Sequence, residues 1–210
     1  MSLFIIWFSA MFPLVFSPGP ANIVFAASGA NVGVRRSLGL LAGVDVVYIL
    51  KSLLVGYGLG KVVESHPMAL NIMQLIGAIY LIYLATKFFA ATKNISANDN
   101  KKLGFIDGAL LQILNSKGWV LVFIMFTLFS EQANDTFGAL GNLILVLWLA
   151  ILNILVHLVH LVWIKAGDLL ARVSNDPNYN KWLNRFYGGC LYLVAAWLIF
   201  DNEIWREGLI

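Results

Sequence analysis

Charged residues and cysteine are scarce in this 210-residue chain. Only 12% of the residues are charged and 60% are apolar, whereas soluble domains have about 25% charged and about 45–50% apolar residues. This composition excludes a separate soluble domain and predicts an all-α protein embedded in a membrane. The single cysteine, Cys190, has no partner for an internal disulfide and argues against thiol redox chemistry.

The chain also lacks the signatures of several functional classes. No basic region precedes the first apolar run, so residues 3–27 are expected to be a retained helix and not a cleaved signal peptide. The formal net charge of +3 fits loops that face a cytoplasm, and we expect no nucleic-acid partner. No nucleophile–base pair, phosphate loop or cofactor motif is present, so we predict no enzymatic activity, no cofactor and no resident metal.

Six apolar segments are long enough to cross a bilayer, which takes about 20 helical residues. They are residues 3–27, 38–60, 69–90, 104–130, 137–164 and 186–204. Basic residues gather in the odd-numbered loops, which predicts that those loops face the cytoplasm and that both termini lie outside a bacterial cytoplasmic membrane. Residues 1–90 and 104–210 would then be two inverted three-helix repeats, joined by a cytoplasmic linker over 91–103.

Two polar interruptions stand out within these segments. Ser17-Pro18-Gly19-Pro20 lies in the first segment, and Asn115-Ser116-Lys117 lies midway through the fourth. Proline removes a backbone donor and frees a carbonyl one turn back. Such broken backbone is tolerated in a membrane only inside protein or beside a polar cavity. Interruptions at corresponding places in two halves predict the central site of a transporter.

Charged side chains within the spans are further candidates, because one at a helix centre costs about 2.5–3.5 kcal/mol to insert. The ammonium of Lys117 could hold a carboxylate or neutralise Asp45. Asp45 could bind a cationic group, relay a proton or pair with a lysine. For Lys51 we favour the interpretation that its long stem reaches the outer surface.

Three polar residues of the fifth segment share one helix face. Asn153, His157 and His160 follow i, i+4 and i+7 spacing. Histidine titrates near neutrality and suits a proton relay, so Asp45, His157 and Asn153 are our proton-coupling candidates. The alternative is a satisfied hydrogen bond between helices, and a metal site would need two or three more ligands.

Glycine pairs open two of the segments. Gly39 and Gly43 begin the second, and Gly104 and Gly108 begin the fourth. Each pair would let a neighbouring backbone approach closely, and such faces make a homodimer possible.

The chain resembles the LysE/RhtB family of bacterial amino-acid exporters. The resemblance rests on Ser17-Pro18-Gly19-Pro20 with Asn22, Gly29 to Arg36 leading into Gly39 and Gly43, Gly77 to Leu84, Asn115-Ser116-Lys117, and Asn184-Arg185 with Gly188. Ser116 stands where the family usually has proline, which implies a softer break in the fourth helix. The resemblance covers nearly the whole chain.

This resemblance implies proton-driven export of an amino acid or a close derivative by alternating access around the two broken helices. The substrate-binding residues expected from the interruptions and the resemblance are Pro18, Gly19, Pro20, Asn22, Asp45, Asn115, Ser116 and Lys117. The alternative is a divalent metal exporter, which would need a cluster of acids with His157 and His160, and the spans offer only Asp45.

Overall fold

The structure is a computed structural model that describes residues 2–16, 19–56, 67–91, 103–174 and 176–205. All regular secondary structure in these residues is helical. The α-helices are α1 (Leu3–Phe16), α2 (Pro20–Leu54), α4 (Pro67–Ala91), α5 (Phe105–Ile113), α6 (Ser116–Phe137), α7 (Gly141–Ala171) and α8 (Pro177–Phe200), with short 3-10 helices η2 (Gly138–Leu140) and η3 (Glu203–Trp205). The all-α class predicted from composition is therefore confirmed.

Four of these helices are long and apolar enough to cross a membrane, and five spans result if α5 and α6 count as one bent span. This count confirms a membrane protein with several spans but does not reach the six predicted. The difference lies mainly in α2, which is counted as one span although it covers the end of the first predicted segment and most of the second. The first predicted segment, residues 3–27, is broken: α1 ends at Phe16 and α2 begins at Pro20.

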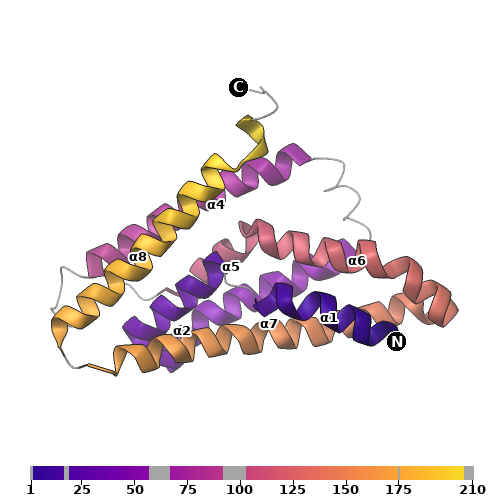
Figure 1. Cartoon of the computed structure of the whole chain (residues 1–210), viewed down its shortest axis with the longest axis horizontal. Coiled ribbons are helices and arrows are strands. Elements are labelled where there is room, and N and C mark those ends of the chain that lie inside the picture. The colour runs from indigo at the N-terminus through magenta and orange to yellow at the C-terminus, as the bar shows by residue number, and fades with distance from the viewer. Residues whose placement is uncertain (1, 17–18, 57–66, 92–102, 175, 206–210) are drawn as a thin grey trace.

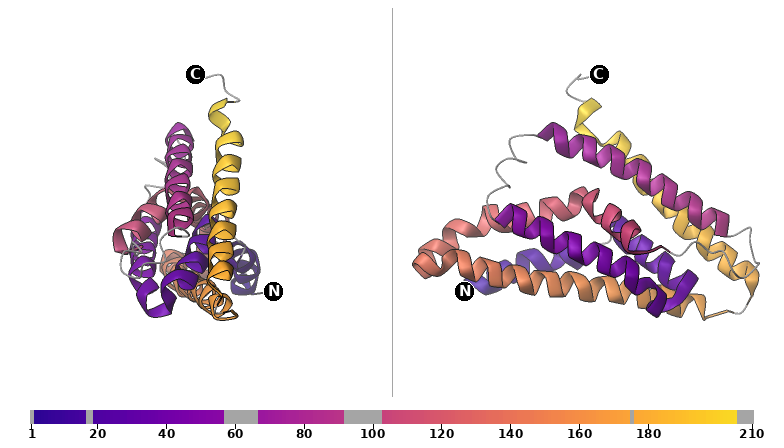
Figure 2. Two further views of the ribbon diagram at one scale, coloured as in Figure 1. Left: turned by 90° about the vertical axis from the view of Figure 1, so that its left-hand side faces the viewer. Right: turned by 180° about the vertical axis from the view of Figure 1, so that it is seen from behind.

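Helix α2 turns back on itself at Gly33. This residue has φ 75° and ψ 173°, a backbone conformation that suits glycine because it has no Cβ. The hydroxyl oxygens of Ser28 and Ser37 lie 2.8 Å apart, although nine residues of straight helix would separate them by about 13.5 Å. Residues 20–32 and 34–54 are therefore two arms of a helical hairpin (Figure 2).

Helices α4 and α8 run antiparallel and side by side (Figure 1). Gln74 Nε2 donates to the carbonyl of Leu198 at 3.0 Å, and Asn202 Nδ2 donates to the carbonyl of Asn71 at 3.0 Å. These bonds join the start of α4 to the end of α8. The pair is closest to the remaining helices near the start of α8 and diverges from them toward its end.

Glycine allows the other helices to pack closely. A Cβ atom on Gly43 would overlap the carbonyl oxygen of Phe105, and one on Gly108 would overlap that of Leu40. The arm of α2 that holds Gly43 therefore contacts α5 backbone to backbone, as the glycine spacing predicted. A Cβ on Gly39 would find its nearest atom at 3.8 Å, so this glycine has room to spare.

These contacts predict unequal effects for two similar substitutions. Gly43→Ala should lower the stability of the purified protein by about 1–3 kcal/mol, the usual cost of overpacking, because the methyl group meets a backbone carbonyl that cannot swing aside. Gly39→Ala is the matched control and should leave the unfolding temperature unchanged or slightly raised. Thermal unfolding in detergent measures both, and equal unfolding temperatures for the two variants would contradict the packing described.

The buried apolar residues form two clusters, and Trp163 of α7 packs against both. One lies between α2, α4, α7 and α8 and includes Phe25, Leu41 and Leu84. The other lies between α1, α2, α6 and α7 and includes Trp7, Tyr48 and Met125.

Candidate substrate site

The two predicted interruptions lie against each other. Gly19, the residue just before α2, is so near Lys117 of α6 that a Cβ on Gly19 would lie 3.4 Å from Lys117 Cδ and 3.5 Å from its Nζ. Helices α5 and α6 are bent by 58° at the second interruption. Ser17 and Pro18 lie outside the described residues, so the first interruption is seen from Gly19 onward.

A cavity of about 410 Å³ opens between the α4–α8 pair and the bend of α5 and α6. It is lined by Gly19, Pro20, Gln74, Gly77, Tyr80, Leu81, Leu111, Leu114, Asn115, Ser116, Lys117, Val120, Trp197, Leu198 and Asp201. Small-molecule sites usually enclose about 300–1,000 Å³, with mostly apolar walls and a few polar groups. The cavity has the size and the lining of such a site.

A smaller cavity of about 50 Å³ lies on the other side of the same residues. It is lined by Leu14, Val15, Gly19, Ala21, Asn22, Tyr48, Gln112, Asn115, Lys117, Gly118, Leu121, Val156 and His160. Gly19, Asn115 and Lys117 line both cavities. The helix breaks therefore form the wall between the two spaces.

The first turn of α6 supplies backbone donors at this wall, and that of α2 supplies fewer, because Pro20 has no N–H and the N–H of Asn22 donates to the Gly19 carbonyl at 3.0 Å. The first N–H groups of a helix have no partner within it and carry the positive end of the helix dipole, so they attract anions. Asn115 occupies the capping position of α6, but its Nδ2 is directed to Gln112 Oε1 at 3.3 Å and does not cap that turn. With Lys117 alongside, the wall is suited to a carboxylate.

Helix α4 closes the other side of the bend. A Cβ on Gly77 would lie 2.7 Å from the carbonyl oxygen of Leu114, so only glycine allows this approach. Gly77 belongs to the stretch that resembles the family's third-helix signature. Its position explains why a small residue is required there.

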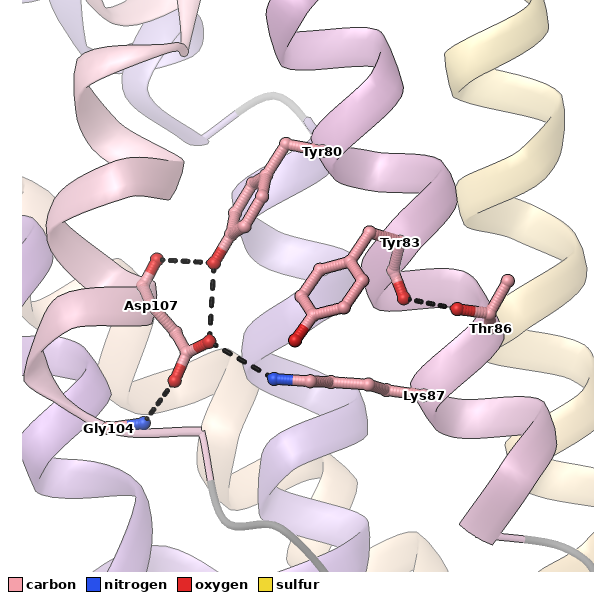
Figure 3. A network of polar contacts seen from close by, with 6 residues as sticks. All are labelled: Tyr80, Tyr83, Thr86, Lys87, Gly104 and Asp107. Carbon is pink, nitrogen blue, oxygen red and sulfur yellow. Dashed lines mark hydrogen bonds and ion pairs between the residues drawn. The ribbon is translucent and has the colours of Figure 1, made fainter.

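A polar network joins α4 to the start of α5 (Figure 3). Lys87 Nζ lies 3.3 Å from Asp107 Oδ1, and the Tyr80 hydroxyl donates to the Asp107 carbonyl at 3.2 Å. Asp107 Oδ2 also accepts from the backbone N–H of Gly104 at 2.9 Å, which caps α5. The Lys87 ammonium lies 4.6 Å from the centre of the Tyr83 ring. Because Tyr80 also lines the large cavity, this network lies at its edge.

Asp45 lines neither cavity and instead contacts α7. Its Oδ2 is 2.5 Å from His157 Nδ1, and its Oδ1 is 4.0 Å from His160 Nδ1. His160 borders the small cavity and contacts Phe25, with ring centres 4.4 Å apart and the ring planes tilted by 35°. The structure thus brings Asp45 and both histidines together, with His160 between the acid and the cavity.

Asn153 does not join this group in the structure. Its Nδ2 donates to the carbonyl of Leu149 at 2.8 Å, one turn back on the same helix. The helical spacing placed Asn153 on the histidine face, but the local carbonyl satisfies its amide. Of the three polar residues on that face, the two histidines are the ones near Asp45.

The interpretation of Lys51 as a surface residue is wrong. Its side chain is 2% exposed, and Nζ donates to the carbonyl of Gln112 at 3.4 Å. The ammonium also lies 5.2 Å from the centre of the Tyr48 ring and 5.4 Å from that of Trp119. Tyr48 lies three residues earlier on the same helix face, and this spacing was the one local signal that the Lys51 side chain points into the bundle.

Sequence reasoning also missed Gln112 and Tyr80. Both line a cavity and neither is charged. Gln112 belongs to none of the motifs, and Tyr80 lies within the Gly77–Leu84 stretch but was not singled out as a site residue. Among the residues that the structure describes, no group of three or more His, Cys, Asp and Glu side chains could hold a metal ion.

Two broken helices that meet beside a cavity with a few polar groups, within a bundle of apolar helices, are typical of a small-molecule membrane transporter. A sequence model of the LysE type translocators matches residues 12–202, and the chain belongs to this family. The family inferred from the motifs is confirmed. The protein is accordingly a transporter and not an enzyme.

Similar proteins support this assignment. The cysteine/O-acetylserine efflux protein of Escherichia coli strain K12 is 26% identical over 187 residues, which cover 87% of this chain and 86% of that protein. An uncharacterized membrane protein of Vibrio cholerae is 25% identical over 195 residues, which cover 87% of this chain and 92% of that one. No solved structure matches the chain.

Proposed function

We propose that this protein exports a small amino acid, or a close derivative, from the cytoplasm across the bacterial inner membrane. The observation that carries the proposal is the meeting of Gly19 and Lys117 at the wall between two cavities. The family and the efflux protein of Escherichia coli support the direction and the class of substrate. Because that relative is named for cysteine and O-acetylserine, small neutral amino acids are the first to test.

The substrate's carboxylate would bind at the first turns of α2 and α6, with Lys117 as its charged partner. The amide oxygens of Asn22 and Asn115, which line the small cavity, would accept from its ammonium group. The side chain would extend into the large cavity, whose lining is mostly apolar. These are the roles we assign to Gly19, Pro20, Ser116 and their neighbours.

Six spans follow if α2 is counted as two arms about Gly33. The first arm continues α1 as a broken span, and α5 and α6 form a second bent span. With α4, α7, α8 and the other arm of α2, the chain would cross the membrane six times as two inverted three-helix repeats. Basic residues in the odd-numbered loops support placing both termini outside.

We further propose that Asp45, His157 and His160 couple export to protons. A carboxylate paired with histidine in a span can take up and release a proton as the transporter changes state. The position of His160 beside the small cavity supports a path between this pair and the substrate. Asp45 would then act on the proton and not on the substrate's amine.

Alternating access would move the α4–α8 pair relative to the other helices. The large cavity reaches Gln74, Trp197 and Asp201, at the end of the pair that we place outside. The network of Lys87, Asp107 and Tyr80 would hold the opposite, cytoplasmic side together. We therefore interpret the structure as the state that faces outward.

This interpretation predicts the effect of Lys87→Met. Without its ion pair the cytoplasmic side should open more often, by about two- to fivefold for a partly exposed pair. Labelling of a cysteine at Leu111 by a maleimide added to inside-out vesicles should rise by that factor, in a Cys190→Ser background. Lys165→Met, which removes another partly exposed ion pair, is the control and should leave labelling unchanged. Unchanged labelling for both variants would reject Lys87 as part of a gate.

The function itself is tested by uptake of labelled amino acids into inside-out vesicles with an imposed pH gradient, acid inside. We expect gradient-dependent accumulation of at least one substrate from a panel that includes cysteine and O-acetylserine. Growth of a deletion strain against dipeptides, each of which raises one cytoplasmic amino acid, would identify the substrate independently. Absence of accumulation for the whole panel, with folded protein in the vesicles, would refute the proposal.

A further inference from the structure

The end of α5 leaves backbone carbonyls that side chains help to satisfy, although the N–H of Asn115 also donates to the Gln112 carbonyl at 3.4 Å. The last four carbonyls of a helix have no partner within it. At the bend, Lys51 Nζ donates to the carbonyl of Gln112 at 3.4 Å, and Trp119 Nε1 donates to that of Ile113 at 2.9 Å. The side chains of Lys51 from α2 and Trp119 from α6 therefore cap the end of α5.

Lys51 is held there as a buried cation without an acidic partner in contact. Among the described residues, no Asp or Glu oxygen lies within 4.0 Å of its Nζ. The ammonium is compensated by the faces of Tyr48 and Trp119 and by the negative end of the α5 dipole. The end of α5 thus helps to stabilise the buried ammonium group of Lys51.

Lys51 also lies directly behind the wall of the small cavity. A side chain at Gly118 would overlap Lys51 Nζ, and Gly118, Gln112 and Tyr48 all line that cavity. Lys117, the residue before Gly118, faces the substrate space. A shift of Lys51 would therefore move the backbone that carries Lys117.

At the bend, α6 begins with a backbone conformation close to that of a helix whose first residue is proline, but its first residue is Ser116. Helices α2, α4 and α8 begin with Pro20, Pro67 and Pro177, whereas α6 begins with Ser116. Proline is favoured at a first helical position. Asn115 has φ −81° and ψ 95°, extended backbone close to the region of about +120° to +160° in ψ that a residue before proline prefers.

We propose that Lys51 is a positioning residue that holds the bend between α5 and α6 where a proline ring would otherwise hold it. By capping the end of α5, it keeps Asn115 and Lys117 turned toward the substrate. This inference rests on the proposed transport function for its role in binding, but not for its role in the shape of the bend.

The test is a double-mutant cycle of Lys51→Met and Ser116→Pro, with KM and maximal rate measured in inside-out vesicles. Lys51→Met should raise KM about tenfold, the loss typical of a residue that orients a ligand group, while the maximal rate per folded protein changes little. Ser116→Pro should recover most of that loss in the Lys51→Met protein. A residue needed only for folding would lower the amount of protein and leave KM unchanged.

A second pair of substitutions, Trp119→Phe with Ser116→Pro, tests the proposal if the Lys51→Met protein does not fold. Trp119→Phe keeps an aromatic ring beside Lys51, although a smaller one, and removes the N–H that caps Ile113. It should raise KM in the same direction but less, and Ser116→Pro should again recover it. If Ser116→Pro lowers KM by the same factor in the wild type as in the variants, its effect is general stabilisation, and the proposal is overturned.

Thermal unfolding of the four purified proteins of the cycle separates this inference from the transport function. Without any substrate, Ser116→Pro should raise the unfolding temperature more in the Lys51→Met protein than in the wild type. If no amino acid is transported by the wild type, the proposed function fails while the unfolding cycle still decides the role of Lys51. Additive unfolding temperatures, or an unchanged KM in Lys51→Met, would reject it.

Discussion

Replacing Lys117 with methionine is expected to reduce the apparent affinity for the exported amino acid about 10- to 100-fold. The change keeps the length of the side chain but removes an ammonium that lines both cavities. A hydrogen bond to a charged group contributes about 1.5–3 kcal/mol, and each 1.4 kcal/mol is about a factor of ten. The loss should appear in KM for gradient-driven uptake into inside-out vesicles.

Two controls bound this prediction. Lys117→Arg keeps a positively charged donor, although a guanidinium group differs in shape from an ammonium group. It should therefore retain more of the affinity than Lys117→Met. Lys181→Met removes a lysine of α8 that lines neither cavity and should leave KM unchanged. If Lys117→Met transports with the wild-type KM, the carboxylate does not bind at this wall.

Asp45→Asn is expected to abolish the response to the pH gradient while leaving exchange of substrate intact. Asparagine fills the same space beside His157 but cannot take up and release a proton. One pH unit corresponds to 1.36 kcal/mol, so a gradient of one unit can drive about tenfold accumulation per coupled proton. In Asp45→Asn vesicles the accumulation ratio should fall to about one.

Exchange between labelled and unlabelled substrate, measured without a gradient, distinguishes loss of coupling from loss of fold. It should persist in Asp45→Asn, because Asp45 lines neither cavity. Asp176→Asn is a matched control, since Asp176 is an exposed helix cap and asparagine caps equally well. Gradient-driven accumulation by Asp45→Asn equal to that of the wild type would remove Asp45 from the coupling path.

Part of the site could be predicted from residues near one another in the chain. Gly19, Asn115 and Lys117 were expected because prolines, a glycine and short polar residues break apolar helices locally, whatever the rest of the protein does. Gly43 and Gly108 were expected to allow close contact for an equally local reason: they have no side chain. The structure shows that contact, and it brings Gly19 against Lys117.

Other features depended on how the helices are rotated and paired. Lys51 was expected to reach the outer surface because a lone lysine near the end of an apolar helix usually does. It is buried because the end of α5 and two aromatic rings lie beside it. In the same way, Asp45 meets His157 and not the cavity, since α7 packs against the arm of α2 that carries it.

The amino-acid sequence alone determined that the chain is a helical membrane protein, where its helices break and which family it resembles, because hydrophobicity, helix-breaking residues and short motifs act within a few turns of one helix. The tertiary structure decided that the two breaks form one wall, that His160 stands between Asp45 and the cavity, and that Lys51 caps α5. Those outcomes join residues far apart in the chain. They depend on the packing of one helix surface against another, which no single segment encodes.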